Sequence, residues 1–356
     1  MKKNIWVFSI ESIETRYTCQ WYEHIPTLLA SRLPDFNVVN VAGVQRHTAP
    51  TEGAFLNFSD TNYWKSSQLC NFLDYLNSGA TTVDDHFVFP DAWNPAVLQL
   101  KYISDLHGYN WKFHGLFHAG SWDPGDFLGR SSGGKPWAVS TERAMYHAYD
   151  RNYFATDFHQ RMFSDYLFDE ETQVSGKLVR TGWPMEYMQP LLAPYAALEK
   201  RNLILFPHRI APEKQVEIFR DLATALPEYE FVVCQDNKLT KEEYHNLLGA
   251  AKIVFSASLQ ETLGISVCAE APLTNAVPMA PDRLSYSEIF ANYPEFLYPS
   301  EWTSDWAAYL QHKQDIISRI VYTMQNYDTL RTALREYADT DYPKFFTADE
   351  LVRQFN

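Results

Sequence analysis

Two glutamates, Glu261 and Glu270, flank a glycine turn and could bind the hydroxyl groups of a sugar. Residues Ile253–Ala257 predict a buried strand, Gly264 a turn, and the residues from Ile265 a helix. A strand that enters a helix through a glycine turn directs free backbone N–H groups and the positive end of the helix dipole at one place, which suits an anion such as a diphosphate. Carboxylates beside it suit neutral hydroxyls. The pattern therefore indicates a nucleotide-sugar, although a surface glutamate before a turn and a half-buried helical glutamate would look the same.

A second group of candidates follows the first predicted strand of the C-terminal half, in Phe206-Pro-His-Arg-Ile-Ala-Pro-Glu-Lys214. Arg209 closes the strand, and Pro212 opens a helix, where its missing N–H is no loss. Lys214 then lies in the first helical turn. A cation there is unfavourable for the helix itself, so it suggests an anionic ligand. The simpler alternative is a solvated Lys214 and an Arg209 paired with Glu213.

Both segments resemble motifs of retaining glycosyltransferases of the GT-B fold. The glycine turn is similar to their E-x7-E signature, in which the first glutamate holds the donor sugar and the second the ribose. Arg209 and Lys214 are similar to the G-R-x-x-x-E-K element, which holds the donor diphosphate. Two departures stand out. Eight residues separate Glu261 from Glu270, which rotates Glu270 by about 100° on a regular helix unless a bulge restores it. Pro207-His208 stands where a glycine is usual, which makes His208 a secondary candidate.

The resemblance continues through Glu230–Gln235, Tyr244–Ala251, Pro281–Phe290 and Tyr293–Pro299. It is closest to the branch that contains the tRNA-queuosine mannosyltransferases and related phage and bacterial enzymes. It covers residues 200–300 well and the N-terminal half loosely. It implies an α/β, GT-B fold with two doubly wound Rossmann-like domains facing a central cleft. It further implies the following donor-binding residues: Arg16, Cys234, Gln235, Thr262, Leu263, Gly264 and Glu270.

In the N-terminal half, His118 ends the predicted strand Phe113–His118 and would face a cleft at the carboxyl end of the sheet. Related enzymes use such a histidine on the donor sugar, and we prefer His118 to the deeper His114. The catalytic candidates are therefore His118, Arg209, Lys214 and Glu261. Residues 10–18 replace the family's glycine-rich loop; there, Arg16 could reach the diphosphate and Glu11 or Glu14 the acceptor.

The acceptor-side candidates are carboxylates and tryptophans near predicted strand ends. They are Glu14, Asp91, Trp93, Trp122, Asp123 and Asp126. The tryptophans could stack on a sugar or a base, although core aromatics are the simpler explanation. The aspartates at 123 and 126 could equally cap turns.

The spacing of apolar residues predicts alternating strands and helices in both halves. Strands are expected at Ile5–Ile10, Phe36–Val41, His86–Phe89, Phe113–His118, Tyr153–Thr156, Leu203–Phe206, Phe231–Cys234, Ile253–Ala257, Ala276–Met279 and Phe296–Tyr298. Helices are expected at Gln20–Arg32, Ser66–Leu76, Pro95–Leu106, His159–Leu167, Pro212–Ala225, Lys241–Ala251 and across Asp305–Arg335. Gly129–Lys135 is expected to be a loop. The predicted domains are 1–195 with 340–356 on the acceptor side, and 196–339 on the donor side.

Length and composition agree with a folded protein of two domains. The 356 residues suit two domains, and 46% hydrophobic with 15% aromatic residues argues against disorder. The net charge of −14 argues against a general nucleic-acid or acidic-membrane binder. Four scattered cysteines, and no signal peptide or long apolar segment, predict a cytoplasmic protein without membrane partners.

The sequence thus predicts a hexosyl- or pentosyltransferase that moves a sugar from a nucleotide-diphosphate sugar to an acceptor hydroxyl with retention. No carboxylate pair for double displacement is evident, and the resemblance implies front-face attack without a metal or other cofactor. The acceptor implied is a modified base in DNA or RNA, and a small molecule, protein or glycan stays open. The alternatives are a nucleotide-sugar epimerase on the same fold and an inactive nucleotide-sugar-binding protein.

Overall fold

In the computed structural model the chain divides into two compact units, and residues 2–14, 16–46, 57–168 and 176–355 are described. Unit 1 comprises Met1–Phe154, Gln160–Arg180 and Glu350–Asn356. Unit 2 comprises Ala155–His159 and Thr181–Asp349. The expected boundary after residue 195 falls inside unit 2, near the end of helix α7 (Met188–Ala196).

Unit 1 is built on a six-stranded parallel sheet with the order β2-β1-β3-β4-β5-β6. Its strands are β1 Asn4–Val7, β2 Asn37–Asn40, β3 His86–Phe89, β4 Lys112–Phe117, β5 Arg151–Phe154 and β6 Leu178–Arg180. Every strand expected in this half overlaps an observed one. Strand β6 was missed because three residues are too few to show a period of two.

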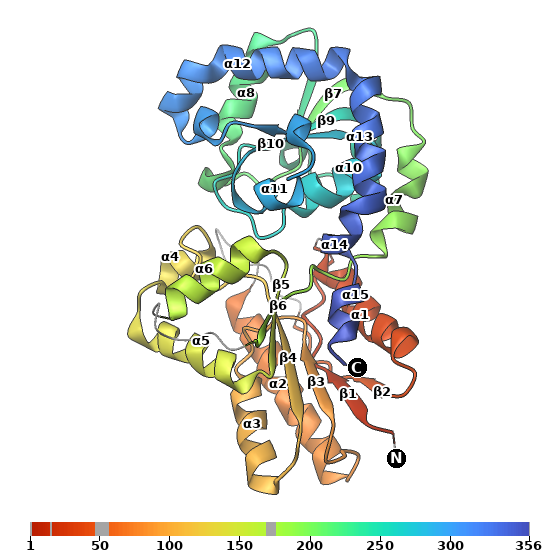
Figure 1. The fold of residues 1–356 in the computed structure, drawn as a ribbon, viewed down its shortest axis with the longest axis vertical. Coiled ribbons are helices and arrows are strands. Elements are labelled where there is room, and N and C mark those ends of the chain that lie inside the picture. The colour runs from red at the N-terminus through yellow and green to blue at the C-terminus, as the bar shows by residue number, and fades with distance from the viewer. Residues whose placement is uncertain (1, 15, 47–56, 169–175, 356) are drawn as a thin grey trace. The chain divides into compact units, whose positions relative to one another are not determined.

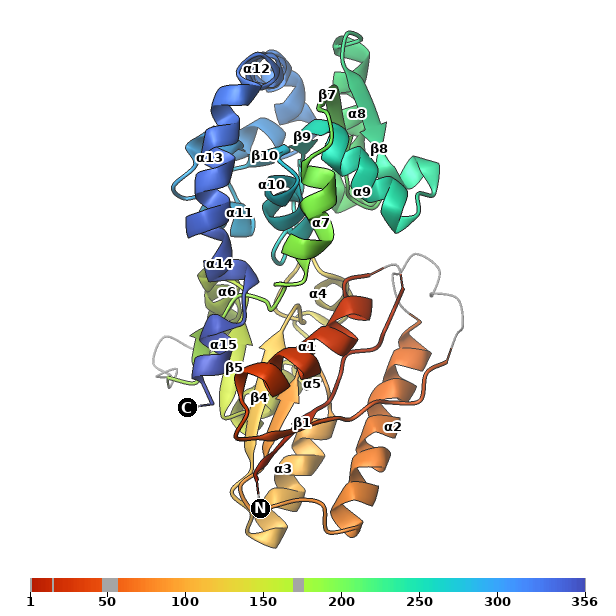
Figure 2. The same ribbon diagram turned by 90° about the vertical axis from the view of Figure 1, so that its right-hand side faces the viewer.

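Helices cover both faces of this sheet (Figures 1 and 2). They are α1 Thr18–Arg32, α2 Phe58–Asn77, α3 Ala96–His107, α4 Phe127–Ser132, α5 Pro136–Ala148, α6 Asp157–Leu167 and α15 Asp349–Arg353. On one face, Phe87 and Phe113 of the strands pack with Phe72 of α2 in the buried cluster that α3, α5 and α6 also join. On the other face, His114 stacks on Phe355, which follows α15, with ring centroids 4.4 Å apart. The end of the chain therefore belongs to unit 1.

Unit 2 is built on a five-stranded parallel sheet with the order β11-β10-β9-β7-β8. Its strands are β7 Arg201–Phe206, β8 Glu230–Val233, β9 Ala251–Phe255, β10 Val277–Pro281 and β11 Leu297–Tyr298. All five were expected. Its remaining helices are α8 Val216–Ala225, α9 Lys241–Ala250, α10 Ala271–Leu273, α11 Leu284–Ile289, α12 Trp306–Gln325, α13 Tyr327–Thr340 and α14 Tyr342–Phe346.

Three local predictions were wrong. Pro212 opens a 3₁₀ turn, Pro212–Lys214, and the helix itself begins at Val216, because Gln215 between them has a φ of 52°. The expected helix over residues 305–335 is two helices that break at Asn326. Part of the expected loop Gly129–Lys135 is helical, since the Asp126 side chain caps α4.

In the described part of the chain, no helix combines the length and the apolar character needed to cross a membrane.

Candidate functional site

The carboxyl ends of β7, β8 and β9 meet at one edge of the unit 2 sheet. Strand β7 lies between the other two, so the connection from β7 to β8 and the connection from β8 to β9 run in opposite directions along the sheet. Ligands of doubly wound sheets bind at such a switch point. The segments that follow these strands carry most of the residues predicted to bind a donor. The structure therefore brings those residues to a single edge.

Glu261 lies at the centre of a charged group at this edge. The Lys214 ammonium is 2.6 Å from Glu261 Oε1 and also donates to the Gln260 carbonyl. His208 Nδ1 is 3.4 Å from the same Glu261 oxygen, and the Ser258 hydroxyl donates to it over 3.2 Å. Lys214 is only 5% exposed. The alternative of a solvated lysine is therefore wrong.

The electrostatics of this group follow from its burial. Burial alone raises the pKa of Glu261, but the Lys214 ammonium and His208 lower it below its ordinary value. Burial lowers the pKa of His208 to about 4, against the opposing effect of Glu261. The site thus holds an ionised carboxylate, an ammonium and a neutral imidazole at neutral pH.

A buried glutamine, Gln215, and a half-buried arginine, Arg283, hold the loop that carries Glu261. Gln215 Nε2 donates to the carbonyls of Ala257 and Thr303, 2.7 and 2.8 Å away. The Arg283 guanidinium donates to the carbonyls of Ala257, Ser258, Ser300 and Thr303, among others. These bonds satisfy carbonyl groups that an irregular loop would otherwise leave unpaired. The left-handed conformation of Gln215 ends the turn that carries Lys214, and its side chain ties that turn to the Glu261 loop.

The Gly264 turn is shaped by a close contact. Gly264 has a φ of 63°, and a Cβ atom there would lie 2.6 Å from the ring of Tyr286. The Gly264 carbonyl accepts the N–H groups of Val267 and Cys268, 2.9 and 2.7 Å away, so the next helix starts at once. Glycine is required at this position both by its backbone conformation and by the neighbouring ring.

The extra residue between the two glutamates is absorbed by a π-helix. Residues Ser266–Glu270 form this wide turn, and the Ala271 N–H donates to the Ser266 carbonyl, five residues earlier. A π turn holds one residue more than an α turn. The bulge that the sequence required to restore the direction of Glu270 is therefore present.

The neighbouring proline explains why the wide turn forms here. Pro272 has no N–H, and its ring would crowd the carbonyl of Cys268, four residues earlier, in a regular helix. In the structure the Cys268 carbonyl accepts a hydrogen bond from the buried Tyr337 hydroxyl of α13 at 2.7 Å. Tyr337 thus replaces the donor that Pro272 lacks.

The remaining donor-side candidates line the same edge. Cys234 begins a 3₁₀ turn, Cys234–Asn237, after β8, and its burial, with the charge of Glu270, raises its pKa to about 12. The Gln235 side chain accepts the Ile210 N–H and so joins the β7 and β8 loops. Arg209 pairs with Glu213 and keeps 39% of its side chain exposed. That pairing was the simpler alternative for Arg209.

Thr262 and Leu263 are held by the fold around them. The Leu263 side chain is buried in the interior, and the Thr262 carbonyl accepts the Ser285 hydroxyl at 2.6 Å. The Leu263 side chain and the Thr262 carbonyl therefore serve the structure of the turn.

In unit 1, His118 follows β4 and is held by its neighbours. Its Nδ1 lies 2.9 Å from the Tyr17 hydroxyl, and its ring meets Trp21 edge-on. Burial lowers the pKa of His118 to about 4, and Asp91 and the Pro90 backbone oppose this shift. Arg16 lies near enough to contribute to the same shift. These residues follow β1, β3 and β4, so the structure does bring them together.

Asp91 and Trp93 are fixed by charged partners. Lys65 of α2 lies 2.8 Å from Asp91 and donates to the Trp93 carbonyl at 2.6 Å. The Trp93 indole donates to the buried carboxylate of Glu142, which also accepts the Ser121 N–H and hydroxyl. Burial alone raises the pKa of Asp91, but Lys65 and His118 lower it below its usual value.

Most of the other acceptor-side candidates have structural roles in unit 1. Trp122 is 2% exposed and belongs to the core cluster of unit 1, so the structure favours the core alternative and leaves no face for stacking. Asp123 is buried and accepts the Gly125 N–H, and Asp126 caps α4, as the turn alternative predicted. Glu14 is exposed. The neighbouring Glu11 is buried and accepts the Thr61 hydroxyl at 2.6 Å.

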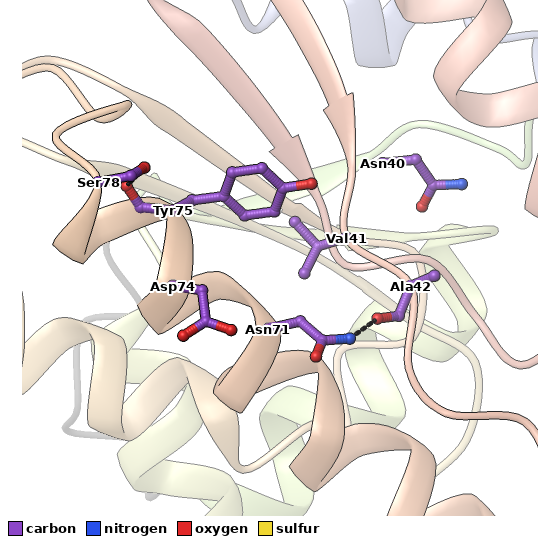
Figure 3. A pocket seen from close by; sticks show the side chains of 7 residues that line it. All are labelled: Asn40, Val41, Ala42, Asn71, Asp74, Tyr75 and Ser78. Atoms are coloured by element: carbon purple, nitrogen blue, oxygen red, sulfur yellow. Dashed lines mark hydrogen bonds between the residues drawn. The ribbon is translucent and has the colours of Figure 1, made fainter.

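Unit 1 also has an open pocket of about 500 Å³ between β2 and α2 (Figure 3). It is lined by Asn40, Val41, Ala42, Asn71, Asp74, Tyr75 and Ser78. None of the predicted site residues lines it, and the Asn71 amide is bonded to the Ala42 carbonyl at 2.8 Å. The pocket therefore gives the sequence predictions no support.

Several residues that contact the candidates were not predicted from the sequence. They are Gln215, Tyr244 and Ser258 in unit 2, and Tyr17 and Lys65 in unit 1. Tyr244 begins one of the segments of resemblance, Tyr244–Ala251, and was not itself a candidate. Its hydroxyl donates to Glu270 Oε2 at 2.5 Å. It lies 26 residues from Glu270, so no local spacing connects the two.

Comparison with solved structures defines the fold. Sucrose-phosphate synthase from Thermosynechococcus elongatus is similar with a TM-score of 0.61 and 11% identity over 99% of this chain and 97% of that one. A glycosyltransferase from Rickettsia africae is similar with a TM-score of 0.59 and 14% identity, over 99% and 97%. Anabaena Alr3699/HepE in complex with UDP is similar with a TM-score of 0.56 and 11% identity, over 100% and 98%. The fold is GT-B.

Sequence comparison adds nothing to this assignment. No family model matches the chain. No curated protein matches it either. The structural likeness at these low identities establishes the fold of the two Rossmann-like units, as the sequence predicted, and leaves the activity to be argued from the site.

Proposed function

We propose that the chain is a glycosyltransferase that takes a sugar from a nucleotide-diphosphate sugar and transfers it, with retention, to an acceptor hydroxyl. The observation that carries the proposal is the buried Lys214–Glu261 pair, with His208 beside it and the Gly264 turn next in the chain. A buried ion pair at a switch point is costly unless further groups satisfy it. A ligand with both anionic groups and hydroxyls would do so.

In this proposal the two charges of the pair have separate ligands. An ammonium has three N–H donors, and Lys214 uses two of them on Glu261 and the Gln260 carbonyl. The third would bind the donor diphosphate, together with the backbone N–H groups that follow Gly264 and with Arg209. Glu261 would accept hydroxyl groups of the transferred sugar. These contacts strengthen as negative charge develops on the leaving diphosphate.

Retention is proposed because the glutamates and the glycine turn resemble the signature of retaining enzymes. The acceptor hydroxyl would attack from the face that the diphosphate leaves, and the leaving phosphate would accept its proton. We expect this chemistry to need no metal. His118, Arg16 and Asp91 of unit 1 are proposed to contact the donor sugar, the diphosphate and the acceptor, in that order.

Nucleotide binding is the first test. Uridine nucleotides come first, because Anabaena HepE has been solved with UDP and with UDP-glucose. Thermal unfolding is measured with UDP, GDP, ADP and the matching nucleotide-sugars. A ligand at 100 times its Kd stabilises a protein by about 2.7 kcal/mol. We expect one base to raise the melting temperature, and Arg209→Ala to reduce that shift. No shift with any nucleotide would refute the proposal.

The reaction type is tested with the nucleotide-sugar that binds. Transfer to a hydroxyl acceptor, followed by NMR of the anomeric proton, distinguishes retention from inversion. The acceptor panel begins with hydroxymethylated bases in DNA and RNA and continues with small molecules, glycans and proteins. A C2 epimer formed without acceptor would indicate a nucleotide-sugar epimerase, and binding without turnover would indicate an inactive binding protein.

A further inference from the structure

Glu270 is held by a tyrosine that lies outside both motifs. Tyr244 lies in the first turn of α9, and its hydroxyl donates to Glu270 Oε2 at 2.5 Å. Thr240 and Glu243 form a capping box at the start of this helix, which fixes the backbone that carries Tyr244. The position of the Tyr244 hydroxyl is therefore set by a rigid element rather than by a loop.

The other side of Glu270 is held by the π-helix. Pro272 prevents a regular turn, and the Tyr337 hydroxyl binds the Cys268 carbonyl that the wide turn displaces. The Thr274 hydroxyl and N–H both bond to the Glu270 carbonyl, at 2.8 and 3.1 Å. Backbone and side chain of Glu270 are thus fixed independently.

The Glu270 carboxylate can accept further hydrogen bonds in addition to the one from Tyr244. A carboxylate has about four lone-pair positions. The Tyr244 hydroxyl occupies one on Oε2, and the Ser266 hydroxyl also bonds to this carboxylate. Burial raises the pKa of Tyr244 well above its ordinary value, and Glu270 adds to this effect. The phenol therefore remains a donor, and the free positions on Glu270 suit two neighbouring hydroxyl groups.

We propose that Tyr244 is a positioning residue that aims Glu270 at the vicinal hydroxyls of the donor ribose, so that the protein selects ribonucleotides over their 2′-deoxy counterparts. The inference rests on the proposed function, because it needs a nucleotide in the unit 2 site. It adds a residue that neither motif contains, and it assigns to the π-helix the task of keeping Glu270 within reach of that residue.

The test compares ribo- and deoxyribonucleotide binding by the full chain. Calorimetry with UDP and 2′-deoxy-UDP, and with GDP and 2′-deoxy-GDP, gives the affinity ratio for each base. We expect the unmodified protein to prefer the ribonucleotide by about tenfold or more, since a site built to bond a hydroxyl rejects the analogue that lacks it. Tyr244→Phe should bring that ratio towards one, mainly by weakening the ribonucleotide.

Tyr327→Phe is the matched control. It also removes one half-buried hydroxyl, which donates to the Asn275 carbonyl at 2.7 Å. A general loss of stability would lower binding in both variants, whereas loss of positioning changes the ribose preference only in Tyr244→Phe. The double variant Tyr244→Phe/Glu270→Gln should lose no more preference than Glu270→Gln alone, because the two residues act as one unit.

The outcomes separate this inference from the proposed function. Ribonucleotide preference that persists in Tyr244→Phe would overturn the inference and leave the nucleotide site intact. Binding without any ribose preference in the unmodified protein would overturn the role of Glu270 and the inference together. No binding of either base would refute the proposed function itself.

Discussion

The two units present the same topological feature with different chemistry. In each sheet the first strand lies between the second and the third, so the carboxyl ends of β1 and β3 and those of β7 and β9 both form switch points. At the unit 2 switch point, Lys214, Glu261 and His208 contact one another directly. At the unit 1 switch point, by contrast, Glu11 is bonded to Thr61 and Asp91 to Lys65, both of α2.

The difference between the two edges is therefore the partner of their charged side chains, although both sheets have the same strand order at this point. The unit 2 loops are bound by Gln215 and Arg283 and carry a buried ion pair. The equivalent charged side chains of unit 1 are turned towards its own helix. Under the proposed function, unit 2 binds the nucleotide, whose diphosphate and ribose recur in every donor, and a fixed site suits such a ligand. Unit 1 would then bind the acceptor, which differs among transferases.

The largest difference is expected between two matched amide substitutions, Glu261→Gln and Asp91→Asn. Both carboxylates sit near a lysine, at 2.6 and 2.8 Å. Glu261→Gln removes the charge beside a buried ammonium and, under the proposed function, an acceptor for sugar hydroxyls. Transfer should fall by about 100-fold or more, as for other preorganised polar groups. Asp91→Asn should lower transfer by less than about tenfold, through the acceptor KM. Steady-state kinetics with each variant measure both effects.

Thermal unfolding is the control for this pair. Because the glutamine oxygen still accepts from Lys214, the loss in unfolding free energy should stay at about 1–3 kcal/mol. Equal losses of activity in the two variants would mean that the carboxylates at the two switch points contribute equally to transfer. The contrast between the units would then be wrong.

Acidification should weaken unit 1 more than unit 2. Burial lowers the pKa of His86 and His118 to about 4 and that of His114 well below its ordinary value of 6.5. In unit 2, burial lowers the pKa of His208 to about 4 and shifts His245 less. Below pH 6.5 these histidines bind protons in the unfolded chain but not in the folded protein, so the free energy of unfolding falls as the pH falls. Each strongly shifted histidine removes about 2 kcal/mol between pH 7 and 5.

Hydrogen exchange, corrected for its intrinsic pH dependence, measures this effect in each unit separately. Protection should drop first in β3, β4 and the segment around Phe355, whose ring stacks on His114 and contacts His86 at a tilt. Lys214 and Glu261 should still hold the unit 2 edge at pH 5, because Lys214 and His208 keep the pKa of Glu261 low. An equal drop in both units would argue against the histidine cluster as the cause.

The contrast also explains which parts of the two edges could be predicted from the sequence. The clustering of the unit 2 candidates was predictable because glycine, proline and charged residues fall close together in sequence, where backbone rules apply directly. The π-helix was foreseen only as a need for a bulge, and its cause, Pro272 with Tyr337, joins residues 65 apart in the numbering. Tyr244 gave no local signal at all.

In unit 1 the same backbone rules identified candidate residue types, but they did not predict the burial or the partners of those side chains. Trp122 and Trp93 look alike in sequence, yet one is buried among Phe154 and Phe163 and the other is held by Glu142. Burial of a single aromatic depends on helices that arrive later in the chain. Asp126 was recognisable as a possible cap, and only the start of α4 decided that it is one.

The smallest expected effect compares two glycines, Gly264 of unit 2 and Gly134 of unit 1. Both have left-handed backbones, with φ of 63° and 71°. A Cβ atom at Gly134 would meet nothing within 4 Å, whereas one at Gly264 would lie 2.6 Å from the Tyr286 ring. Gly134→Ala should therefore lower the unfolding free energy by about 1–2 kcal/mol through its backbone alone. Gly264→Ala should lower it by about 1–3 kcal/mol more, because Tyr286 is fully buried and must move. Urea unfolding of both variants measures the difference, and equal values would show that the Gly264 turn can relax, so that the unit 2 edge is less rigid than its contacts indicate.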